Sequence, residues 1–336
     1  MAVLAVQVLV IKEMRGQGTA GLADRLRQAA ELTSLDAEGS KPWHLKLEVQ
    51  TFDKDGKPAE SGTVEEWWAS ATLNRVVYTS PSGTTTEIHN GDGYFRTAGS
   101  PGGDYLFDLM RQQVVHPMPS DYESKGIKLE EQTESFGKVK LDCVMLGQEI
   151  RGVGYPPLGL FPTYCLEHDG ASLRVTYDFG SLAVTRNKVG KFGEKMVPLE
   201  SSANENSKVV ATAKTVALQT VPLTAADFVP GDDLKKAGDG PAKLASGVIA
   251  GSKLGGPNPI YPQSAKERHI SGTVVMHAII GRDGRIHRLT LISYPDGDLA
   301  ISALNAVRQW TYKPYLLLGE PTEVDTTITV NYNFGP

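Results

Sequence analysis

The sequence predicts an α+β protein: a large curved antiparallel β-sheet with an accompanying helix, followed by a small domain of two helices and three antiparallel strands. Its 336 residues are enough for about two domains, and 40% of them are hydrophobic, which is enough for real cores. Short runs of alternating polar and apolar residues, joined by tight-turn signals, fill most of the chain. The last quarter changes to the order helix, strand, strand, helix, strand.

The charge balance excludes one class of partner. The chain has a net charge of −5, and charged residues make up 22% of it. It has no basic excess, so it lacks the electrostatic footprint of a nucleic-acid-binding protein. It also has no polybasic run that would attract anionic lipid headgroups. We therefore expect no nucleic-acid partner.

The chain starts with an apolar run, Met1 to Ile11. This run has about the length of a signal-peptide core, but no positive segment precedes it and no clear cleavage site follows it. It is shorter than the roughly 20 residues that span a bilayer. One interpretation is that residues 1–20 are the remnant of a signal or export segment, and the other is a buried helix or strand. A longer natural N-terminus would supply an anchor in the inner membrane.

Residues 21–234 are expected to form one β-rich, half-barrel-like domain. Apolar residues with helical spacing over residues 21–34 predict its helix. Period-two alternation starts at residues 44–52, "HLKLEVQTF", and strand-like runs recur as far as residues 208–219, "KVVATAKTVALQ". Strands this closely spaced predict an antiparallel sheet that curls around a helix or an apolar cavity.

The segment between the two domains is expected to be a linker over residues 235–256. Between residues 231 and 259 the chain has seven glycines, three prolines and little periodicity. The C-terminal domain is then expected to cover residues 257–336.

The C-terminal region has the most regular pattern. Residues 272–280, "GTVVMHAII", and residues 286–294, "IHRLTLISY", flank the turn signal "GRDGR", which predicts a β-hairpin. Residues 298–310 have amphipathic helical spacing, and residues 322–334 alternate between an apolar and a polar face. The final strand must cross the helix to reach an edge of the sheet.

The two cysteines, Cys143 and Cys165, both lie in strand-like runs. They are candidates for a cross-strand disulfide, whose loop of about 20 residues would contribute roughly 3 kcal/mol, or for buried thiols in a reducing compartment. Cys165 and His168 have a C-x-x-H spacing, but these groups are too few to specify a zinc site. The seven histidines form no cluster in the sequence, so we expect no metal and no cofactor.

The sequence does not point to an enzyme. Glu65 and Glu66, beside Trp67 and Trp68, are the strongest candidates for an acid pair. Adjacent residues on a strand point to opposite faces, so these two carboxylates cannot flank one bond. The G-x-S-x-G, Walker and G-x-G-x-x-G motifs are all missing from the sequence.

A set of short motifs in residues 257–335 resembles the C-terminal domain of the TonB family of energy transducers. They are Tyr261-Pro262, Gly272-x-Val274, Asp283-Gly284-Arg285-Ile286, Ala306-Val307-Arg308-x-Trp310-x-Tyr312-x-Pro314 and Gly319-x-Pro321, before a closing amphipathic strand. The resemblance implies a periplasmic protein of the Gram-negative envelope, with two helices on one face of the three-stranded sheet. The motif residues that we expect to be structural are Tyr261, Pro262, Gly272, Asp283, Gly284, Trp310, Tyr312 and Pro314.

The same resemblance implies a partner, but this sequence differs from the family pattern in two ways. Family members bind outer-membrane TonB-dependent receptors through a short receptor peptide that pairs with the exposed edge strand. They also begin with a membrane-spanning helix and carry a long Pro-rich spacer, whereas this sequence shows no such helix and has a β-rich region in place of the spacer. That region resembles the half-barrels of periplasmic lipoprotein carriers, which implies lipid as a ligand.

The candidate partner-binding site is the final strand. An edge strand offers unpaired N–H and C=O groups, which an extended peptide can satisfy. A plain edge strand, protected by its polar face, remains an alternative. So does a lipid or lipoprotein carrier whose terminal domain is a structural appendage or makes a homodimer. The candidate contact residues are Thr322, Val324, Thr326, Ile328, Val330 and Tyr332.

Overall fold

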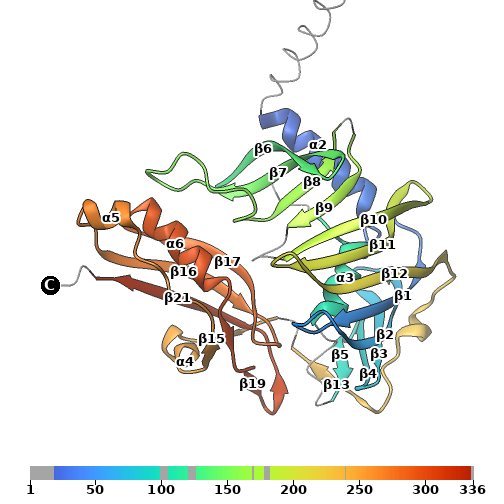
Figure 1. Ribbon diagram of the computed structural model, residues 1–336. Coiled ribbons are helices and arrows are strands. Elements are labelled where there is room, and N and C mark those ends of the chain that lie inside the picture. Colours follow the sequence, from blue (N-terminus) through green and yellow to red (C-terminus); the bar gives the residue numbers. More distant parts are fainter. Residues whose placement is uncertain are drawn as a thin grey trace, which may run out of the picture.

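The computed structural model describes residues 19–98, 105–119, 126–168, 170–177, 182–238 and 240–333. It consists mostly of strands, with few helices, and contains a large curved sheet beside a smaller sheet covered by helices (Figure 1). The expected α+β architecture is therefore present at this level. The apolar run from Met1 to Ile11 lies outside the described residues.

Thirteen strands within the described residues make up the large sheet. They are β1 (Trp43–Phe52), β2 (Pro58–Ser70), β3 (Leu73–Ser80), β4 (Gly83–Asn90), β5 (Gly93–Thr97), β6 (Ile127–Phe136), β7 (Val139–Gln148), β8 (Thr163–Glu167), β9 (Leu173–Tyr177), β10 (Leu182–Phe192), β11 (Lys195–Glu205), β12 (Lys208–Thr220) and β13 (Leu234–Ala237).

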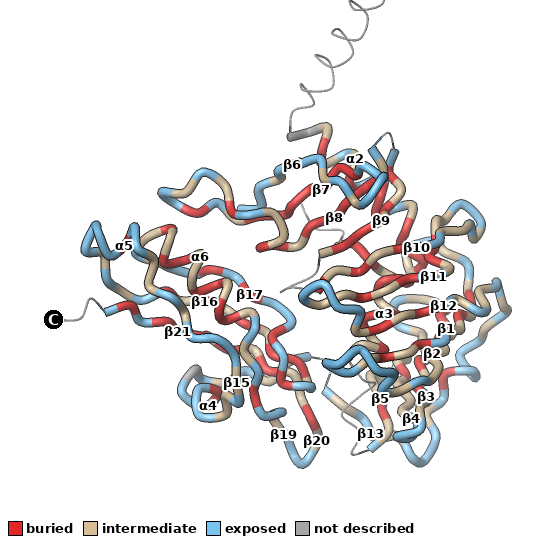
Figure 2. The backbone as a smooth tube through the Cα atoms, in the orientation of Figure 1, coloured by how far each residue is buried: buried red, intermediate tan, exposed pale blue. Residues whose placement is uncertain are grey.

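The sheet is built from two antiparallel meanders. Its order is β13-β5-β4-β3-β2-β1-β12-β11-β10-β9-β8-β7-β6, so the meanders join where β1 pairs with β12. Along β1 the side chains of Leu45, Leu47 and Val49 are buried and alternate with more exposed polar residues, as the period-two pattern predicts. Figure 2 shows this alternation of buried and exposed positions along the strands.

Two helices pack against the large sheet. Helix α3 (Tyr105–Val115) buries Phe107, Met110 and Val114 in one core with residues of β1, β2 and β3. Helix α2 (Thr19–Thr33) packs Leu22 and Leu26 against apolar residues of β7, β8 and β9. Helical side chains therefore fill much of the space that the curled sheet surrounds.

The small domain combines a sheet, helices and two short ladders. Its sheet strands are β14 (Ala242–Lys243), β16 (Gly272–Ile280), β17 (Ile286–Ser293) and β21 (Val324–Tyr332), and its helices are α4 (Ser246–Ala250), α5 (Gln263–Glu267) and α6 (Gly297–Val307). The ladders pair β15 (Lys253–Gly255) with β18 (Thr311–Tyr312) and β19 (Leu316–Leu317) with β20 (Glu320–Pro321).

The expected three-stranded sheet is extended by a fourth strand. The order is β14-β21-β16-β17, in which β16 is antiparallel to both of its neighbours and β14 is parallel to β21. The prediction of three strands was therefore incomplete. The physical reason is that the outer side of β21 carries unpaired backbone groups, and residues from before the domain satisfy some of them.

The segment expected to be a linker, residues 235–256, is largely structured. It contributes residues of β13 to the large sheet, β14 to the small sheet and β15 to a short ladder, and Ile249 of α4 is buried in the core of the small domain. The boundaries of the two domains stay a prediction, because this segment takes part in both of them.

The two domains share apolar contacts. Met145, Ile150, Leu160 and Phe161, from the β7 to β8 region, lie in the same hydrophobic cluster as the core of the small domain. A Cβ atom on Gly297, the first residue of α6, would lie only 2.6 Å from the Arg151 carbonyl oxygen. The loop after β7 therefore packs closely against the start of α6. Among the described helices, none has both the length and the apolar character needed to cross a membrane.

Candidate partner-binding edge

Strand β21 lies at the outer margin of the small domain (Figure 1). It pairs with β16 along its whole length, from Val324 opposite Ile280 to Tyr332 opposite Gly272. On its other side, the described residues provide one short paired strand, β14, and helix α4, which follows β14, also lies against β21. Beyond β14, no described strand pairs with that side of β21.

Strand β14 covers the first part of this edge. The Ala242 N–H donates to the Glu323 carbonyl oxygen at 2.7 Å, and the Leu244 N–H donates to the Asp325 carbonyl oxygen at 2.9 Å. The Thr326 hydroxyl also donates to the Leu244 carbonyl oxygen at 2.9 Å. The region from Glu323 to Thr326 is thus already occupied by a segment of the same chain.

The rest of the edge is open at alternate residues. Because the carbonyl groups of Glu323 and Asp325 point toward β14, the backbone groups of the following odd-numbered residues point the same way. These residues are Thr327, Thr329 and Asn331, and no described strand pairs with their outward N–H and C=O groups. Their side chains are short and polar, and those of Thr329 and Asn331 are exposed.

Five of the six residues predicted as contacts have their side chains on the opposite, buried face of β21, and their backbone groups point toward β16. The side chains of Val324, Thr326, Ile328, Val330 and Tyr332 are buried against the core of the small domain. Thr322 precedes β21, is half-buried and donates its N–H to the Tyr315 carbonyl oxygen. The alternation identified the two faces, but only the pairing with β16 decides which residues direct their backbone groups outward.

The polar face next to this edge contains two side-chain contacts between β16 and β21. His277 Nε2 on β16 lies 2.7 Å from Asp325 Oδ1 on β21. The Thr273 hydroxyl donates to Asn331 Oδ1, also at 2.7 Å. Both contacts join β21 to β16, so they hold the strand in place without covering its outer side.

The opposite edge of the small sheet, β17, meets the large domain. The Gln148 side chain, at the end of β7, donates Nε2–H to the Leu291 carbonyl oxygen at 3.2 Å and accepts the Leu291 N–H at 3.3 Å. One side-chain amide thus satisfies both outward backbone groups of a β17 residue. The Tyr294 hydroxyl accepts the Arg151 N–H close by.

The family motifs explain how the chain reaches β21. Gly284 has φ +77°, and a Cβ atom at this residue would lie 1.9 Å from the Tyr312 carbonyl oxygen. The Tyr312 N–H donates to the Gly284 carbonyl oxygen at 2.8 Å, and the Tyr312 side chain is buried. The β16–β17 turn and the segment after α6 therefore fit together only with glycine at residue 284.

Trp310 and Pro314 are less buried than Tyr312. Trp310 is half-buried, donates Nε1–H to the Pro257 carbonyl oxygen at 2.7 Å and stacks under the Lys253 ammonium at 3.4 Å from its ring centroid. Pro314 is exposed. Trp310 thus holds the segment around Pro257 against the end of α6. Pro314 follows in the exposed segment that leads away from this helix.

The remaining motif residues support the far end of β21. The Tyr261 ring meets the Tyr332 ring edge-on at 5.5 Å between centroids, and its hydroxyl donates to the Ile270 carbonyl oxygen. Pro262 directly precedes α5. Gly272 has φ +145° and packs against Pro295. All of these contacts lie within the small domain, and the structural roles of these residues stay a prediction.

The β16–β17 turn also contains a titrating pair. His287 Nε2 lies 3.1 Å from Asp283 Oδ1, and the Arg285 N–H donates to the same oxygen. Burial alone would raise the pKa of Asp283, but the hydrogen bond and charge of His287 hold this pKa below its usual value. Burial would lower the pKa of His287, but Asp283 raises it above its usual value.

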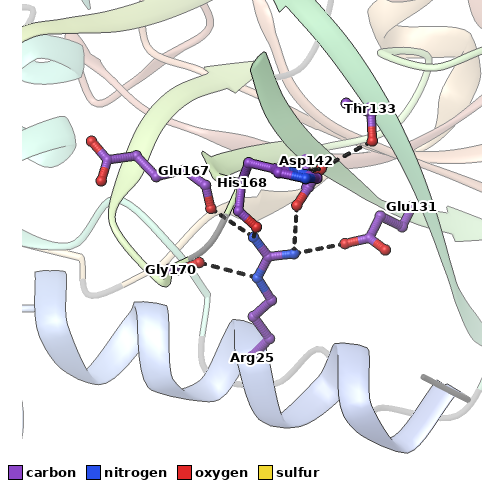
Figure 3. A network of polar contacts seen from close by, with 7 residues as sticks. All are labelled: Arg25, Glu131, Thr133, Asp142, Glu167, His168 and Gly170. Carbon is purple, nitrogen blue, oxygen red and sulfur yellow. Dashed lines mark hydrogen bonds and ion pairs between the residues drawn. The ribbon is translucent and has the colours of Figure 1, made fainter. Parts of the chain in front are cut away.

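A second polar cluster lies far from this edge and fixes helix α2 to the large sheet (Figure 3). One guanidinium nitrogen of Arg25 is 2.8 Å from a Glu131 oxygen and 3.0 Å from an Asp142 oxygen. The other nitrogens donate to the backbone carbonyl oxygens of Glu167, at 2.7 Å, and Gly170, at 3.1 Å. The cluster thus joins α2 to β6, β7 and the turn after β8.

Asp142 is the buried centre of this cluster. Burial would raise the pKa of its carboxyl group, but hydrogen bonds from His168, Thr133 and Arg25 hold the pKa below its usual value. Its oxygens lie 2.9 Å from His168 Nδ1 and 3.0 Å from the Thr133 hydroxyl. With every close group engaged, the arrangement is that of a structural ion-pair network.

The two cysteines are neighbours of this cluster. Cys143 on β7 and Cys165 on β8 face each other in register and form a disulfide. Among the described residues there is no group of three or more His, Cys, Asp or Glu side chains that could hold a metal ion. Glu65 binds His44 and Lys46, whereas Glu66 is buried and pairs with Arg111 at 2.8 Å, so the two carboxylates serve opposite faces of β2.

Comparison with known proteins supports the assignment of the small domain. Residues 257–334 match the family model described as the C-terminal region of the Gram-negative bacterial TonB protein. This match contains β16, β17, α6 and β21. No match is found among curated proteins.

Solved structures resemble the large domain only loosely. A LolA superfamily protein from Nitrosomonas europaea has a TM-score of 0.41 and 10% identity, and the match covers 61% of this chain and 97% of that protein. An outer membrane lipoprotein-sorting protein domain from Vibrio parahaemolyticus has a TM-score of 0.40 and 8% identity, with the same coverage.

The motifs of the small domain and the family match agree in position. The expected resemblance to the C-terminal domain of the TonB family is therefore confirmed over residues 257–334.

Proposed function

We propose that the small domain binds an extended segment of an outer-membrane TonB-dependent receptor, or of another envelope protein, by strand addition to β21. In this role the chain supports transport across the outer membrane from the periplasmic side. The observation that carries the proposal is the row of outward backbone groups at Thr327, Thr329 and Asn331, in a domain that matches the TonB family.

The chemistry of this edge suits an added strand. Main-chain hydrogen bonds to β21 would supply affinity, and side chains near the edge would select the partner. The side chains of Thr329 and Asn331 are small enough to let another backbone approach. The buried side chains of Ile328 and Val330 keep the strand rigid, so little order has to be gained on binding.

The test uses one position on the open edge. Thr329→Pro removes the outward N–H but no hydrogen bond to β16, whereas Thr329→Val keeps the N–H and a similar side-chain volume. Fluorescence anisotropy with peptides from the periplasmic N-terminal segments of TonB-dependent receptors should show at least about tenfold weaker binding for the proline variant. The valine variant should bind like the wild-type protein. Peptide binding that proline leaves unchanged would rule out strand addition here.

The alternative function, a carrier of lipid or lipoprotein, has less support. Helix α3 occupies the inner side of the curled sheet. Two cavities beside α3, of about 460 and 480 Å³, both have polar and charged lining residues, and Asp108 and Gln112 line both of them. An acyl chain would gain little from such a lining. Native mass spectrometry of gently purified protein tests this alternative, since a co-purifying lipid would favour a carrier.

A further inference from the structure

The chain supplies its own strand at the proposed binding edge. Residues 242–244 lie beside residues 323–326 with parallel register, Ala242 opposite Val324 and Lys243 opposite Asp325. Their N–H groups donate to two backbone carbonyl oxygens of the β21 segment, and the Leu244 carbonyl oxygen accepts the hydroxyl of Thr326. A partner strand that ran along the whole of β21 would need the same backbone groups.

This internal strand is weakly held in comparison with the other side of β21. It pairs over two residues, whereas β16 pairs with β21 over nine. Lys243 is exposed, and Ala242 and Leu244 are only half-buried. The Leu244 side chain packs against the rim of the small core, so it provides the main apolar contact of the strand.

The strand is nevertheless kept near its site from both ends. Only residues 238–241 separate it from β13, which is paired with β5 in the large sheet. On the other side, Ile249 of α4 is buried in the core of the small domain. Such short connections maintain a high local concentration, so the strand would rebind quickly after opening.

We propose that residues 242–244 are a built-in competitor that partners must displace from β21, which makes this contact autoinhibitory. This inference rests on the proposed function. The displacing segment is a strand parallel to β21 with an apolar side chain in the place of Leu244. Until displacement, only the edge from Thr327 to Asn331 is open, and it holds a partner over too few residues for tight binding.

The fraction of molecules in which the internal strand is closed sets the size of the effect. A partner binds the open form, so its apparent dissociation constant is the intrinsic constant divided by the open fraction. If the internal strand is closed about nine times in ten, removing it strengthens binding about tenfold.

One variant opens the contact between the internal strand and β21, and a second variant is its control. Ala242→Pro removes the N–H that donates to the Glu323 carbonyl oxygen. Lys243→Pro is the matched control, because alternation in a strand directs the Lys243 N–H away from β21. We expect Ala242→Pro to bind receptor peptides about tenfold more tightly than the wild-type protein, and Lys243→Pro to change binding much less.

A second variant closes the contact and does not depend on how the proline variant folds. Lys243 and Asp325 are register partners, so Lys243→Cys with Asp325→Cys allows a disulfide that locks the internal strand onto β21. The oxidised protein should bind the peptides at least about tenfold more weakly, and a reductant should restore the binding. The wild-type protein with the same reductant controls for the native disulfide between Cys143 and Cys165.

The outcomes separate the two proposals. Affinity that falls in the order open variant, wild type, locked variant supports the competition. Equal affinity of the wild-type protein and the locked variant overturns it, while peptide binding itself still stands. If the wild-type protein, the open variant and the reduced double-cysteine protein all fail to bind any receptor peptide, the proposed function fails and the competition fails with it.

Discussion

The two edges of the small sheet are covered in different ways. At β17, the Gln148 side chain from the large domain makes two hydrogen bonds with Leu291, and the adjoining loop after β7 contributes Ile150 to the shared apolar cluster. At β21, a two-residue strand covers one end, and the outward groups of Thr327, Thr329 and Asn331 have no described strand beside them.

The difference indicates where a partner can enter. Exposing the β17 edge requires the two domains to separate and a shared core to open, which costs apolar burial. Exposing all of β21 requires the loss of a short local strand and a shift of the adjoining helix α4, while the contact between the two domains stays closed. Edges of β-sheets attract other strands unless they are covered, so the lightly covered edge is the one available for regulated pairing.

The largest effect is expected from a substitution that disrupts the packing of the small domain, on which both edges depend. Gly284→Ala would place a Cβ atom 1.9 Å from the Tyr312 carbonyl oxygen at a positive φ, so it should destabilise the small domain by about 3 kcal/mol or more. The matched control is Gly319→Ala, since Gly319 also has a positive φ, of +88°, but its Cβ would meet no described atom within 4 Å. That variant should lose only about 1 kcal/mol. Chemical denaturation measures both, and equal losses would contradict the packing argument.

A smaller effect separates the two edges. Gln148→Ala leaves the outward groups of Leu291 without their partner and should cost about 1–2 kcal/mol. The Leu291 amide should then exchange its hydrogen faster, while peptide binding at β21 stays within about twofold of wild type. Gln148→Glu is the control that keeps the acceptor for the Leu291 N–H and loses the donor. If Gln148→Ala weakened peptide binding strongly, the two edges would not be independent.

The smallest effect is a pH dependence on the β17 side. Asp283 has a lowered pKa in the folded protein, so its contribution is present above its unfolded pKa and disappears as the pH falls through the folded value. His287 has a raised pKa, so its contribution is present below its unfolded pKa and is lost as the pH rises through the folded value. The pair should therefore stabilise most between about pH 4 and 6.5, by at most about 1 kcal/mol.

Denaturation curves across this range check the prediction with His287→Gln as the control. In this variant, the free energy of unfolding should depend less on pH over this range. If the dependence of stability on pH is the same with and without His287, the pair of His287 and Asp283 does not contribute to it.

Local patterns in the sequence predicted much of this structure, for physical reasons. Alternation in residues 44–52 and 324–332 reflects one buried and one exposed face, which a sheet imposes whatever its neighbours are. Gly284 and Tyr312 were identified through motifs, and their contact explains why these residue types occur together.

The parts that could not be predicted depend on distant contacts. Ala242 and Lys243 have no strand pattern, because β14 forms only where β21 offers unpaired groups. The sequence prediction puts the contact residues on the buried side of β21, because alternation does not reveal which residues hydrogen-bond to β16. The domain contact at Gln148 likewise joins residues more than a hundred positions apart in the chain.

The most direct measurement is amide hydrogen exchange along β21 during titration with a receptor peptide. Strand addition predicts new protection at Thr327, Thr329 and Asn331, whose N–H groups point outward, and little change at Ile328 and Val330, which already pair with β16. Protection without this alternation, or confined to residues away from β21, would contradict the account.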